Sequence, residues 1–381
     1  MKLALVLFEY FPYGGLQRGC ALVAEECARR GHRVRVAAGS WEGTPPPGVA
    51  VEVLGRQGAS NVARDRSFVR RWQAYRAREP VDGVIGFNKL PGLDVYYGSD
   101  SCYVERMRRL RPAWYRWTPR YRHFHAWERA VFARGAGTHI LMLAEQEIPV
   151  YRRLYATEPE RFHVLPPGLT CRRETEDDRA RMRCDVRARF GWGSEELLLL
   201  LVGSGFRTKG LDRAIRGLAA LPRELRDRAR LVVVGDDSPG RYRWLARGLG
   251  IGSRVAFLGG RPSVYEFLVA ADLLVHPAYA ENTGNVLIEA LTAGLPVLAS
   301  GACGYAGHVV AARAGRIVGT PDAFSQGEFN RAATEMLVSD ERTQWRANGL
   351  EYARVTDLYS RREKAADVIE AVVSARRQAS P

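Results

Sequence analysis

Residues 3–8 read Leu3-Ala4-Leu5-Val6-Leu7-Phe8, and a turn with Pro12, Gly14 and Gly15 follows before a helical stretch. An uninterrupted apolar run of this length is typical of a strand that is buried on both faces. A second strand is expected over residues 34–37, and helical segments alternate with further apolar runs. This order of strand, glycine turn, helix and strand predicts a doubly wound parallel sheet.

The same order of elements begins again at residues 197–202, an apolar run that precedes Gly203-Ser204-Gly205. A chain of 381 residues is long enough for two domains of ordinary size. We therefore expect an α/β protein in which two Rossmann-like doubly wound domains, residues 1–167 and 168–355, face a central cleft. A C-terminal helix over residues 356–381 is expected to pack back on the first domain. One large sheet is the alternative.

The chain carries 57 basic and 42 acidic side chains, a net charge of +15, and 46% of its residues are hydrophobic. The hydrophobic content excludes global disorder, and the charge favours acidic partners such as nucleic acid, an anionic membrane or a phosphorylated substrate. The N-terminal apolar run is too short for a signal peptide, and no stretch has the roughly 18 apolar residues of a membrane span. Six dispersed cysteines fit neither a disulfide scaffold nor a zinc site. We expect a cytoplasmic protein that is soluble or peripheral on a membrane.

The loop over residues 276–289 follows an apolar strand and opens an apolar helix. Ligands of parallel sheets bind at the carboxyl ends of the strands, and the free amides of a helix N-terminus suit a phosphate or diphosphate. Those amides would come from Thr283, Gly284 and Asn285. Glu281 would face the group attached to the diphosphate, and Glu289 could accept hydrogen bonds from a ribose diol. The alternative is a helix cap with two surface glutamates.

Three further loops hold candidate site residues. In the loop 203–210 the spacing of glycine and lysine is not that of a P-loop, but Lys209 is one of only four lysines among 57 basic residues. A lysine against this arginine background indicates a compact charge for a phosphate. The adjacent Gly14 and Gly15 disfavour a nicotinamide or flavin cofactor and allow a polar ligand to approach a helix start. Asp100 could handle a hydroxyl proton or be a solvated turn aspartate.

Residues 103–134 combine nine arginines and two glutamates with interleaved tryptophans, tyrosines and phenylalanines. This pattern predicts a membrane or acceptor surface, formed by Arg106, Arg109, Trp114, Arg116, Trp117, Arg120, Arg122 and Trp127. The same pattern could bind single-stranded nucleic acid, or the aromatic residues could be partly buried. His123 and His125 are assigned to this surface. The sequence has no Asp-x-Asp element and no histidine pair at helical spacing, so no metal site is expected.

Glu281 and Glu289 are separated by seven residues, after a strand and across a helix start. This spacing resembles the signature of the family 4 retaining glycosyltransferases, which have the GT-B fold. Further stretches look like those of the lipopolysaccharide core glucosyltransferases of that family, namely residues 11–18, 39–43, 86–96, 165–168 and 303–306. The resemblance runs nearly from end to end of the chain.

The resemblance implies transfer of glucose from UDP-glucose to a heptose of the lipopolysaccharide inner core, with retention at the anomeric carbon and without a metal or another cofactor. The first domain would bind the acceptor, and the second would bind the nucleotide sugar. Glu289 would bind the ribose, Glu281 the donor sugar, and Asp100 the acceptor hydroxyl. Lys209 would neutralise the charge of the departing UDP. The other residues implied at the donor are Gly15, Arg173, Arg207, Gly284, Asn285 and Val286.

The implied partners are a UDP-sugar, the inner-core acceptor and an anionic membrane surface, which would make the protein peripheral on the cytoplasmic face of the inner membrane. UDP-galactose or a UDP-N-acetylhexosamine would use the same diphosphate contacts and remain alternative donors. With this resemblance nucleic acid is not an expected partner. A nucleic-acid-binding protein that uses the arginine-rich surface is the alternative from another class. An oxidoreductase is disfavoured because the dinucleotide fingerprint is missing.

The chain departs from the family pattern at two positions. The family usually has an aspartate directly after the run that ends at Arg18, where this chain has Gly19. An acidic role at that position therefore cannot be carried over, which favours Asp100. The phosphate loop of the family usually has an arginine directly before its lysine, where this chain has Thr208. Arg207 could substitute from one position earlier.

Overall fold

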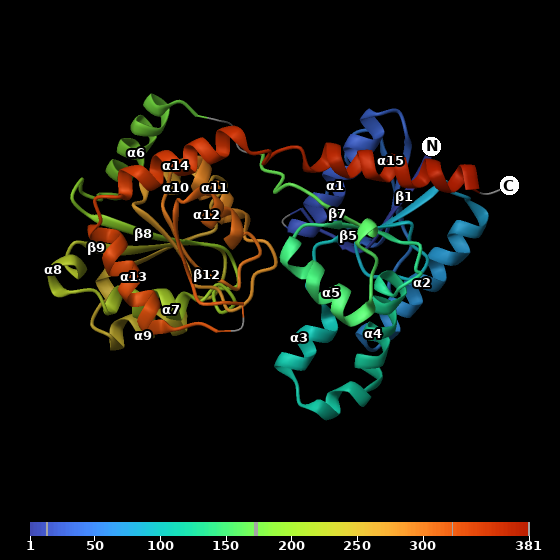
Figure 1. Cartoon of the computed structure of the whole chain (residues 1–381), viewed down its shortest axis with the longest axis horizontal. Coiled ribbons are helices and arrows are strands. Elements are labelled where there is room, and N and C mark those ends of the chain that lie inside the picture. The colour runs from blue at the N-terminus through green and yellow to red at the C-terminus, as the bar shows by residue number, and fades with distance from the viewer. Residues whose placement is uncertain (13, 171–173, 322, 380–381) are drawn as a thin grey trace. The chain divides into compact units, whose positions relative to one another are not determined.

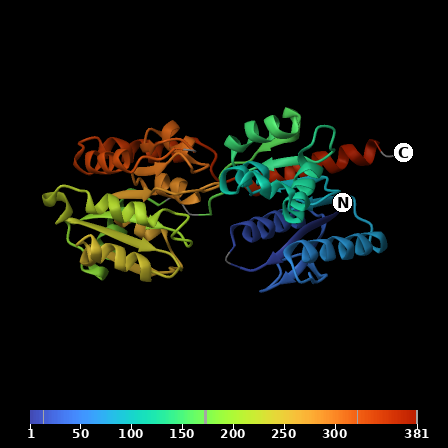
Figure 2. The ribbon, with the colours of Figure 1, turned by 90° about the horizontal axis from the view of Figure 1, so that it is seen from below.

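The computed structural model describes residues 1–12, 14–170, 174–321 and 323–379. The chain divides into an N-terminal unit, Met1–Gly168 with Ser360–Pro381, and a C-terminal unit, Leu169–Tyr359. In each unit the strands form one parallel sheet that carries helices on both faces (Figure 1). The view turned by 90° shows the same layering (Figure 2).

Within the described residues, the sheet of the N-terminal unit has the strand order β3-β2-β1-β4-β5-β6-β7. Its strands are β1 (Lys2–Tyr10), β2 (Arg33–Trp41), β3 (Val49–Val53), β4 (Gly83–Gly86), β5 (Val95–Gly98), β6 (His139–Met142) and β7 (Phe162–Val164). The α-helices are α1 (Gly15–Arg29), α2 (Asn61–Arg78), α3 (Tyr103–Leu110), α4 (Pro119–Phe132), α5 (Ile148–Tyr155) and α15 (Arg361–Ala379). Short 3-10 helices are η1 (Ala113–Trp117), η2 (Glu145–Glu147) and η3 (Pro159–Arg161).

The central strand β1 is apolar throughout because both of its faces are covered. Leu3, Leu5 and Leu7 belong to a core that includes buried residues of α1 and α15. Ala4 and Val6 belong to a second core, on the other face, with residues of α2 and α4. Alternate residues of a strand point to opposite faces, so two helical layers require a continuous apolar run.

Within the described residues, the sheet of the C-terminal unit has the strand order β10-β9-β8-β11-β12-β13. Its strands are β8 (Leu197–Val202), β9 (Ala229–Val234), β10 (Val255–Gly259), β11 (Leu273–His276), β12 (Val297–Ser300) and β13 (Gly315–Val318). Its helices are α6 (Glu176–Phe190), α7 (Leu211–Ala219), α8 (Arg223–Arg226), α9 (Gly240–Gly248), η4 (Gly252–Arg254), α10 (Tyr265–Ala270), α11 (Asn285–Ala293), α12 (Ala306–Ala312), α13 (Gln326–Val338) and α14 (Arg342–Val355).

The prediction of two doubly wound α/β sheets is confirmed. In both sheets the chain order reverses beside a central strand, at β1/β4 and at β8/β11. Such reversal points are where open parallel sheets bind ligands, at the carboxyl ends of the strands. The sequence did not predict β6, β7 and β13, which are short strands of three or four residues that contain polar side chains.

Helix α15 belongs to the N-terminal unit although it follows the C-terminal unit in the sequence. A Cβ atom on Gly83 of β4 would lie 2.3 Å from Val373, so a glycine lets the helix lie directly against the sheet. Arg30 of α1 donates hydrogen bonds to Asp367 and Glu370 of the same helix. On α15, the side chains of Ala365, Ala366, Ile369 and Val373 have no exposed surface.

Candidate active site

Two loops at the carboxyl ends of neighbouring strands meet in the C-terminal unit. The backbone amide of Tyr279, after β11, donates to the carbonyl oxygen of Thr208, after β8, at 2.8 Å. Gly210 has a φ of +74°, and a Cβ atom there would lie 2.0 Å from the Pro277 carbonyl oxygen. The glycine is therefore required for the two loops to approach each other.

Lys209 and Glu281 form an ion pair where these loops meet. The Lys209 Nζ donates a hydrogen bond to the Glu281 Oε2, and both side chains are largely buried. Burial alone would raise the pKa of the Glu281 carboxyl, but His276 and the Lys209 ammonium lower it to about 2. Glu281 is consequently ionised at neutral pH, and Lys209 is its counter-ion.

His276 is a site residue that the sequence analysis missed. It ends β11, has no exposed surface, and its Nε2 lies 3.5 Å from the Glu281 Oε2. Neither ring nitrogen has a well-formed hydrogen bond to a described residue. Burial lowers the pKa of the imidazole, so the ring is neutral at neutral pH. A histidine that directly follows an apolar strand, ahead of Pro277, is the signal that could have identified it.

The N-terminus of α11 faces the same loops. Gly284 is its N-cap residue, with a φ of +90°, and no side chain of a described residue caps the helix there. The amides of Asn285 and Val286 belong to the first turn, which carries the positive end of the helix dipole. Glu289 is half-buried and lies one turn beyond Asn285 on the same side of the helix. This arrangement can bind a diphosphate with an adjacent diol.

The neighbouring loop after β12 holds the candidate loop in place. The amide of Gly304 donates to the Glu281 carbonyl oxygen at 3.0 Å, and the amide of Tyr305 donates to the Thr283 carbonyl oxygen at 2.7 Å. A Cβ atom on Gly304 would lie 1.8 Å from the Asn282 carbonyl oxygen. Backbone contacts therefore fix the position of Glu281.

The resemblance implies two arginines at the donor in addition to the Lys209–Glu281 pair. Arg207 lies in the same loop as Lys209, and its side chain is exposed to solvent. Arg173 lies outside the described residues. The C-terminal unit therefore brings together Lys209, Arg207, Glu281, Gly284, Asn285, Val286 and Glu289 on two loops and one helix.

Gly15 and Asp100 lie in the N-terminal unit, both just beyond the carboxyl ends of strands. Gly15 is the first residue of α1, and a Cβ atom there would meet no atom within 4 Å. Asp100 follows β5, is exposed, and accepts a hydrogen bond from the Tyr151 hydroxyl through its backbone carbonyl. The carboxylate of Asp100 is thus left facing solvent at this edge of the sheet.

The unusual Gly19 has a structural reason. A Cβ atom on Gly19 would lie only 2.9 Å from the Tyr97 hydroxyl oxygen and 3.1 Å from the ring carbon that bears it. Tyr97 is buried in the core between α1 and the sheet. The aspartate that the family pattern would place at this position therefore does not fit beside Tyr97 as it lies here.

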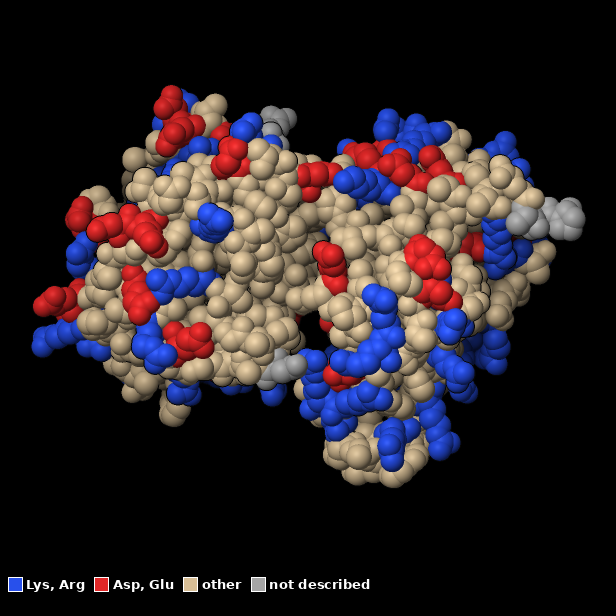
Figure 3. Space-filling model, in the orientation of Figure 1, with Lys and Arg blue, Asp and Glu red and all other residues tan. Residues whose placement is uncertain are grey.

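The predicted basic surface is largely exposed. Trp114 and Trp117 of η1 are 60% and 59% exposed, and Leu110 beside them is 68% exposed. The arginines predicted for this surface also face solvent, namely Arg106, Arg109, Arg116, Arg120 and Arg122. Figure 3 shows the basic side chains gathered over α3, η1 and α4 at the bottom of the view. We call residues 103–122 the basic aromatic surface.

His123 is buried and Trp127 is half-buried against the core, so neither lies fully on the predicted surface. Their rings lie 4.2 Å apart between centroids, and Trp127 also contacts Phe8 of β1. His123 is 4% exposed and lies 3.8 Å from the buried Asp65 carboxylate. On α4 the residues at this spacing face the sheet, so the aromatic pattern mixes core and surface positions.

Glu128 is a buried carboxylate that anchors the basic aromatic surface to the unit. It accepts hydrogen bonds from the backbone amides of Tyr103 and Val104, at 2.7 and 3.1 Å, where α3 begins. It also accepts from the Lys89 Nζ at 2.5 Å and from the Tyr155 hydroxyl at 2.7 Å. Burial alone would raise the pKa of the Glu128 carboxyl. The Lys89 ammonium and these hydrogen bonds outweigh that effect, so the pKa is lowered.

Among the described residues, no helix combines the length and apolar character that crossing a bilayer requires. Within the same residues, no three side chains of the histidine, cysteine, aspartate and glutamate types lie together as metal ligands would.

Comparison with known proteins places this chain among glycosyltransferases. A model of the group 1 glycosyl transferases matches residues 183–351. The lipopolysaccharide glucosyltransferase WaaG of Escherichia coli K12 is 44% identical over 97% of this chain and 98% of its own length. A crystal structure of WaaG, a glycosyltransferase involved in lipopolysaccharide biosynthesis, has a TM-score of 0.88 at 43% identity, over 96% of this chain and 99% of that chain. Anabaena HepE in complex with UDP-glucose has a TM-score of 0.71 at 17% identity, over 98% of this chain and 100% of that chain, a likeness of fold alone.

Proposed function

This chain belongs to the group 1 glycosyltransferase family of the lipopolysaccharide glucosyltransferase WaaG, and we propose that it transfers glucose from UDP-glucose to a heptose of the lipopolysaccharide inner core. The chain is accordingly a GT-B hexosyltransferase. In this proposal the C-terminal unit binds the nucleotide sugar, and the N-terminal unit binds the acceptor. Transfer retains the configuration of the anomeric carbon and requires no metal.

The observation that carries the proposal is the Lys209–Glu281 pair beside the N-terminus of α11. A diphosphate at this helix start would accept from the amides of Gly284, Asn285 and Val286 and would attract Lys209 away from Glu281. These groups stabilise the negative charge that develops on UDP as the bond to the sugar breaks. Arg207, on the same loop as Lys209, adds positive charge there, and the resemblance implies the same role for Arg173.

Glu281 has a second task once Lys209 has moved to the diphosphate. Its carboxylate then accepts hydrogen bonds from hydroxyl groups of the donor sugar, and His276 remains beside it at 3.5 Å. Glu289 binds the two ribose hydroxyls one turn further along α11. Gly15 leaves room for the sugar, and Asp100 orients the acceptor hydroxyl that attacks the anomeric carbon. The same contacts with the diphosphate would hold another UDP-hexose.

The acceptor is a phosphate-bearing glycolipid that lies in a membrane, so the enzyme has to work at the membrane surface. The basic aromatic surface fits this requirement, because its arginines suit anionic head groups and its exposed tryptophans suit the bilayer interface. We propose that this surface holds the protein on the cytoplasmic face of the inner membrane.

A donor screen tests the proposal. Purified protein is incubated with lipopolysaccharide that ends at the inner-core heptose and with UDP-glucose, UDP-galactose or UDP-N-acetylglucosamine, and UDP release and product mass are measured. We expect acceptor-dependent UDP release and the addition of one hexose with UDP-glucose. Transfer from UDP-galactose or UDP-N-acetylglucosamine but not from UDP-glucose would show that the donor sugar is not glucose. Absence of transfer from all three donors would contradict the proposal.

A further inference from the structure

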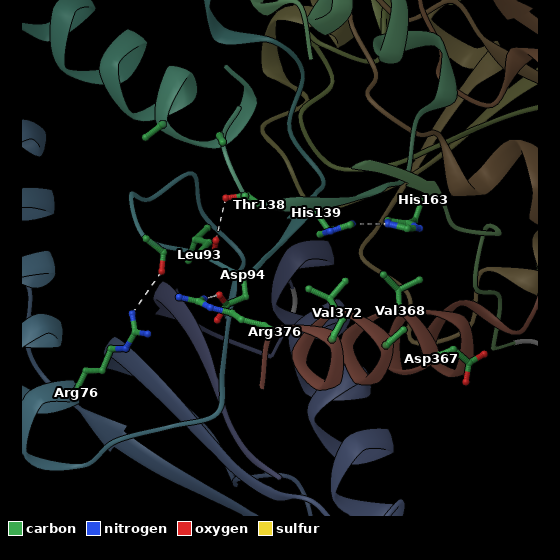
Figure 4. Close-up of a pocket in the computed structure, with 16 residues that line it drawn as sticks. Arg76, Leu93, Asp94, Thr138, His139, His163, Asp367, Val368, Val372 and Arg376 are labelled. Carbon is green, nitrogen blue, oxygen red and sulfur yellow. Dashed lines mark hydrogen bonds and ion pairs between the residues drawn. The ribbon is translucent and has the colours of Figure 1, made fainter. Parts of the chain in front are cut away.

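A groove lies in the N-terminal unit at the edge of the sheet opposite to Asp100. It has a volume of about 1110 Å³ and runs between α15 and the segments that lead into β5 and β6. Asp94 and Thr138, which line it, directly precede these strands. Figure 4 shows α15 along one side and the side chains of Arg76 and Arg376 at one end. This volume is slightly above the range that is typical of small-molecule sites, about 300–1,000 Å³.

The long wall of the groove is apolar. Helix α15 presents Val368, Ala371, Val372 and Ala375 along it. These positions recur at spacings of three and four residues, so they form one stripe along the helix. The stripe borders the face of α15 that packs on the sheet, because Val368 and Val372 also contact the core formed by the buried residues of that face. Val368 and Val372 are half-buried, and both alanines are exposed.

One end of the groove carries uncompensated positive charge. Asp94 is buried and pairs with Arg376, while its Oδ2 also accepts from the Val84 amide at 2.8 Å. Arg76 has no ion pair with any residue that the structure describes, and its closest hydrogen-bond acceptor is the Gly92 carbonyl oxygen at 3.5 Å. Burial and the neighbouring Arg376 lower the pKa of the Arg76 guanidinium. An anion at this end would relieve the repulsion between the two arginines.

The remaining polar groups do not supply that anion. Asp367, at the far end, is held by Arg30 of α1 at 2.6 Å. His139 and His163 lie beside the apolar wall, with the Nδ1 of the first 3.0 Å from the Nε2 of the second. Burial lowers the pKa of both imidazoles, so at neutral pH they add polar atoms without charge. A cationic ligand is therefore disfavoured, and an anionic one is favoured.

We propose that this groove binds a single alkyl chain that carries an anionic head group, a carboxylate or a phosphate. The chain lies along the stripe of α15, and the head group lies between Arg76 and Arg376. The apolar wall supplies burial of the chain, and the two guanidinium groups supply charge-assisted hydrogen bonds. This site is separate from the donor and acceptor chemistry, because it lies at the other edge of the sheet.

Calorimetric titration of the full-length protein with dodecyl phosphate, below its micelle-forming concentration, tests the site. We expect saturable binding of one molecule per chain. Ala371→Trp fills the groove from an exposed helix position and should abolish binding, whereas Gln378→Trp, which does not line the groove, should bind like the wild type. Arg76→Gln should weaken binding at least about tenfold because a charge-assisted contact is lost, and Arg78→Gln on the same helix should leave it unchanged.

Dodecyl maltoside and dodecyltrimethylammonium serve as uncharged and cationic probes with the same chain. We expect both to bind at least about tenfold more weakly than dodecyl phosphate. Absence of saturable binding to the wild type would overturn the proposal, and so would unchanged binding to Ala371→Trp or to Arg76→Gln. Equal affinity for the three probes would contradict the proposed preference for an anionic head group. Thermal unfolding of each variant establishes that it is folded.

Discussion

At the scale of single residues, the candidate active site holds Lys209 and Glu281 as partners of each other. In the proposed function a diphosphate would compete with Glu281 for the ammonium group, and the carboxylate that it releases is already ionised. A buried carboxylate without a counter-ion is costly, and hydroxyl groups of a bound sugar can satisfy it. Donor binding would thus replace the Lys209–Glu281 pair by contacts of Lys209 with the diphosphate and of Glu281 with the sugar.

The stabilisation that Glu281 supplies should depend on pH in a definite direction. Its pKa falls from 4.5 to about 2 on folding, so its contribution is fully present above the unfolded value and is lost as the pH falls through the folded value. The difference in free energy of unfolding between the wild type and Glu281→Gln should shrink by roughly 2–3 kcal/mol from about pH 5 to pH 2. Urea unfolding measures this difference.

The exposed Glu195 provides the control for this measurement. Glu195→Gln should change the free energy of unfolding by less than about 0.5 kcal/mol at every pH, since exposed charges contribute little. A constant difference between the wild type and Glu281→Gln over the same pH range would show that the Glu281 carboxyl is not held ionised by its neighbours.

At the scale of elements, α3 depends on a carboxylate from another helix. Glu128 of α4 accepts from two amides at the start of α3 and is paired with Lys89. Removing one partner of a buried ion pair leaves the other charge unpaired, so Glu128→Gln should lower the free energy of unfolding by about 3–5 kcal/mol. Hydrogen exchange of residues 103–110 should also become faster.

Glu105→Gln is the matched variant on α3 itself. Glu105 pairs with Arg109 and Arg153, both of which are exposed, so its loss should cost less than about 1 kcal/mol. Equal effects of the two substitutions, measured by urea unfolding, would contradict the anchoring role of Glu128.

The short helix η1 should carry much of the affinity for membranes. Replacing Trp114 and Trp117 by serine removes two exposed aromatic side chains and should weaken binding to vesicles of anionic phospholipid at least about tenfold. Co-sedimentation with vesicles measures this. Trp244→Ser removes a tryptophan that is 77% exposed in the C-terminal unit and should have no effect. An equal loss of vesicle binding in the Trp114/Trp117 variant and in Trp244→Ser would contradict a specific contact of η1 with the membrane.

The elements also show what sequence patterns can and cannot predict. Long apolar runs identified β1 and β8 because both faces of these strands are buried. The loops after β8 and β11 directed attention to Lys209 and Glu281. The short strand β7, with half-buried and exposed residues, has no such pattern. The roles of His276 and Glu128 and the burial of Trp127 depend on contacts between distant segments, which no local pattern contains.

At the scale of the whole molecule, each unit has its own hydrophobic cores, and α15 completes one of the two cores of the N-terminal unit. Ile369→Ala should lower the stability of that unit by about 2–5 kcal/mol, because it opens a cavity in the core. UDP should still stabilise the C-terminal unit in this variant. Thermal unfolding with and without UDP measures both effects, and Val338→Ala at an exposed position is the control.

Loss of UDP-dependent stabilisation in Ile369→Ala would show that the nucleotide site depends on the N-terminal core. In the proposed function the diphosphate instead binds to the C-terminal unit alone, through Lys209 and the amides at the start of α11. Catalysis in this account is stabilisation of the departing UDP by these groups.

The rate of glucose transfer by Lys209→Ala is the most direct test of that claim. With saturating UDP-glucose and acceptor, and with a chelator present, kcat should fall by about 10²–10³ relative to the wild type, as expected when a charge that stabilises the transition state is removed. Lys2→Ala, which removes another of the four lysines, should keep the wild-type kcat. An unchanged kcat in Lys209→Ala would contradict the account.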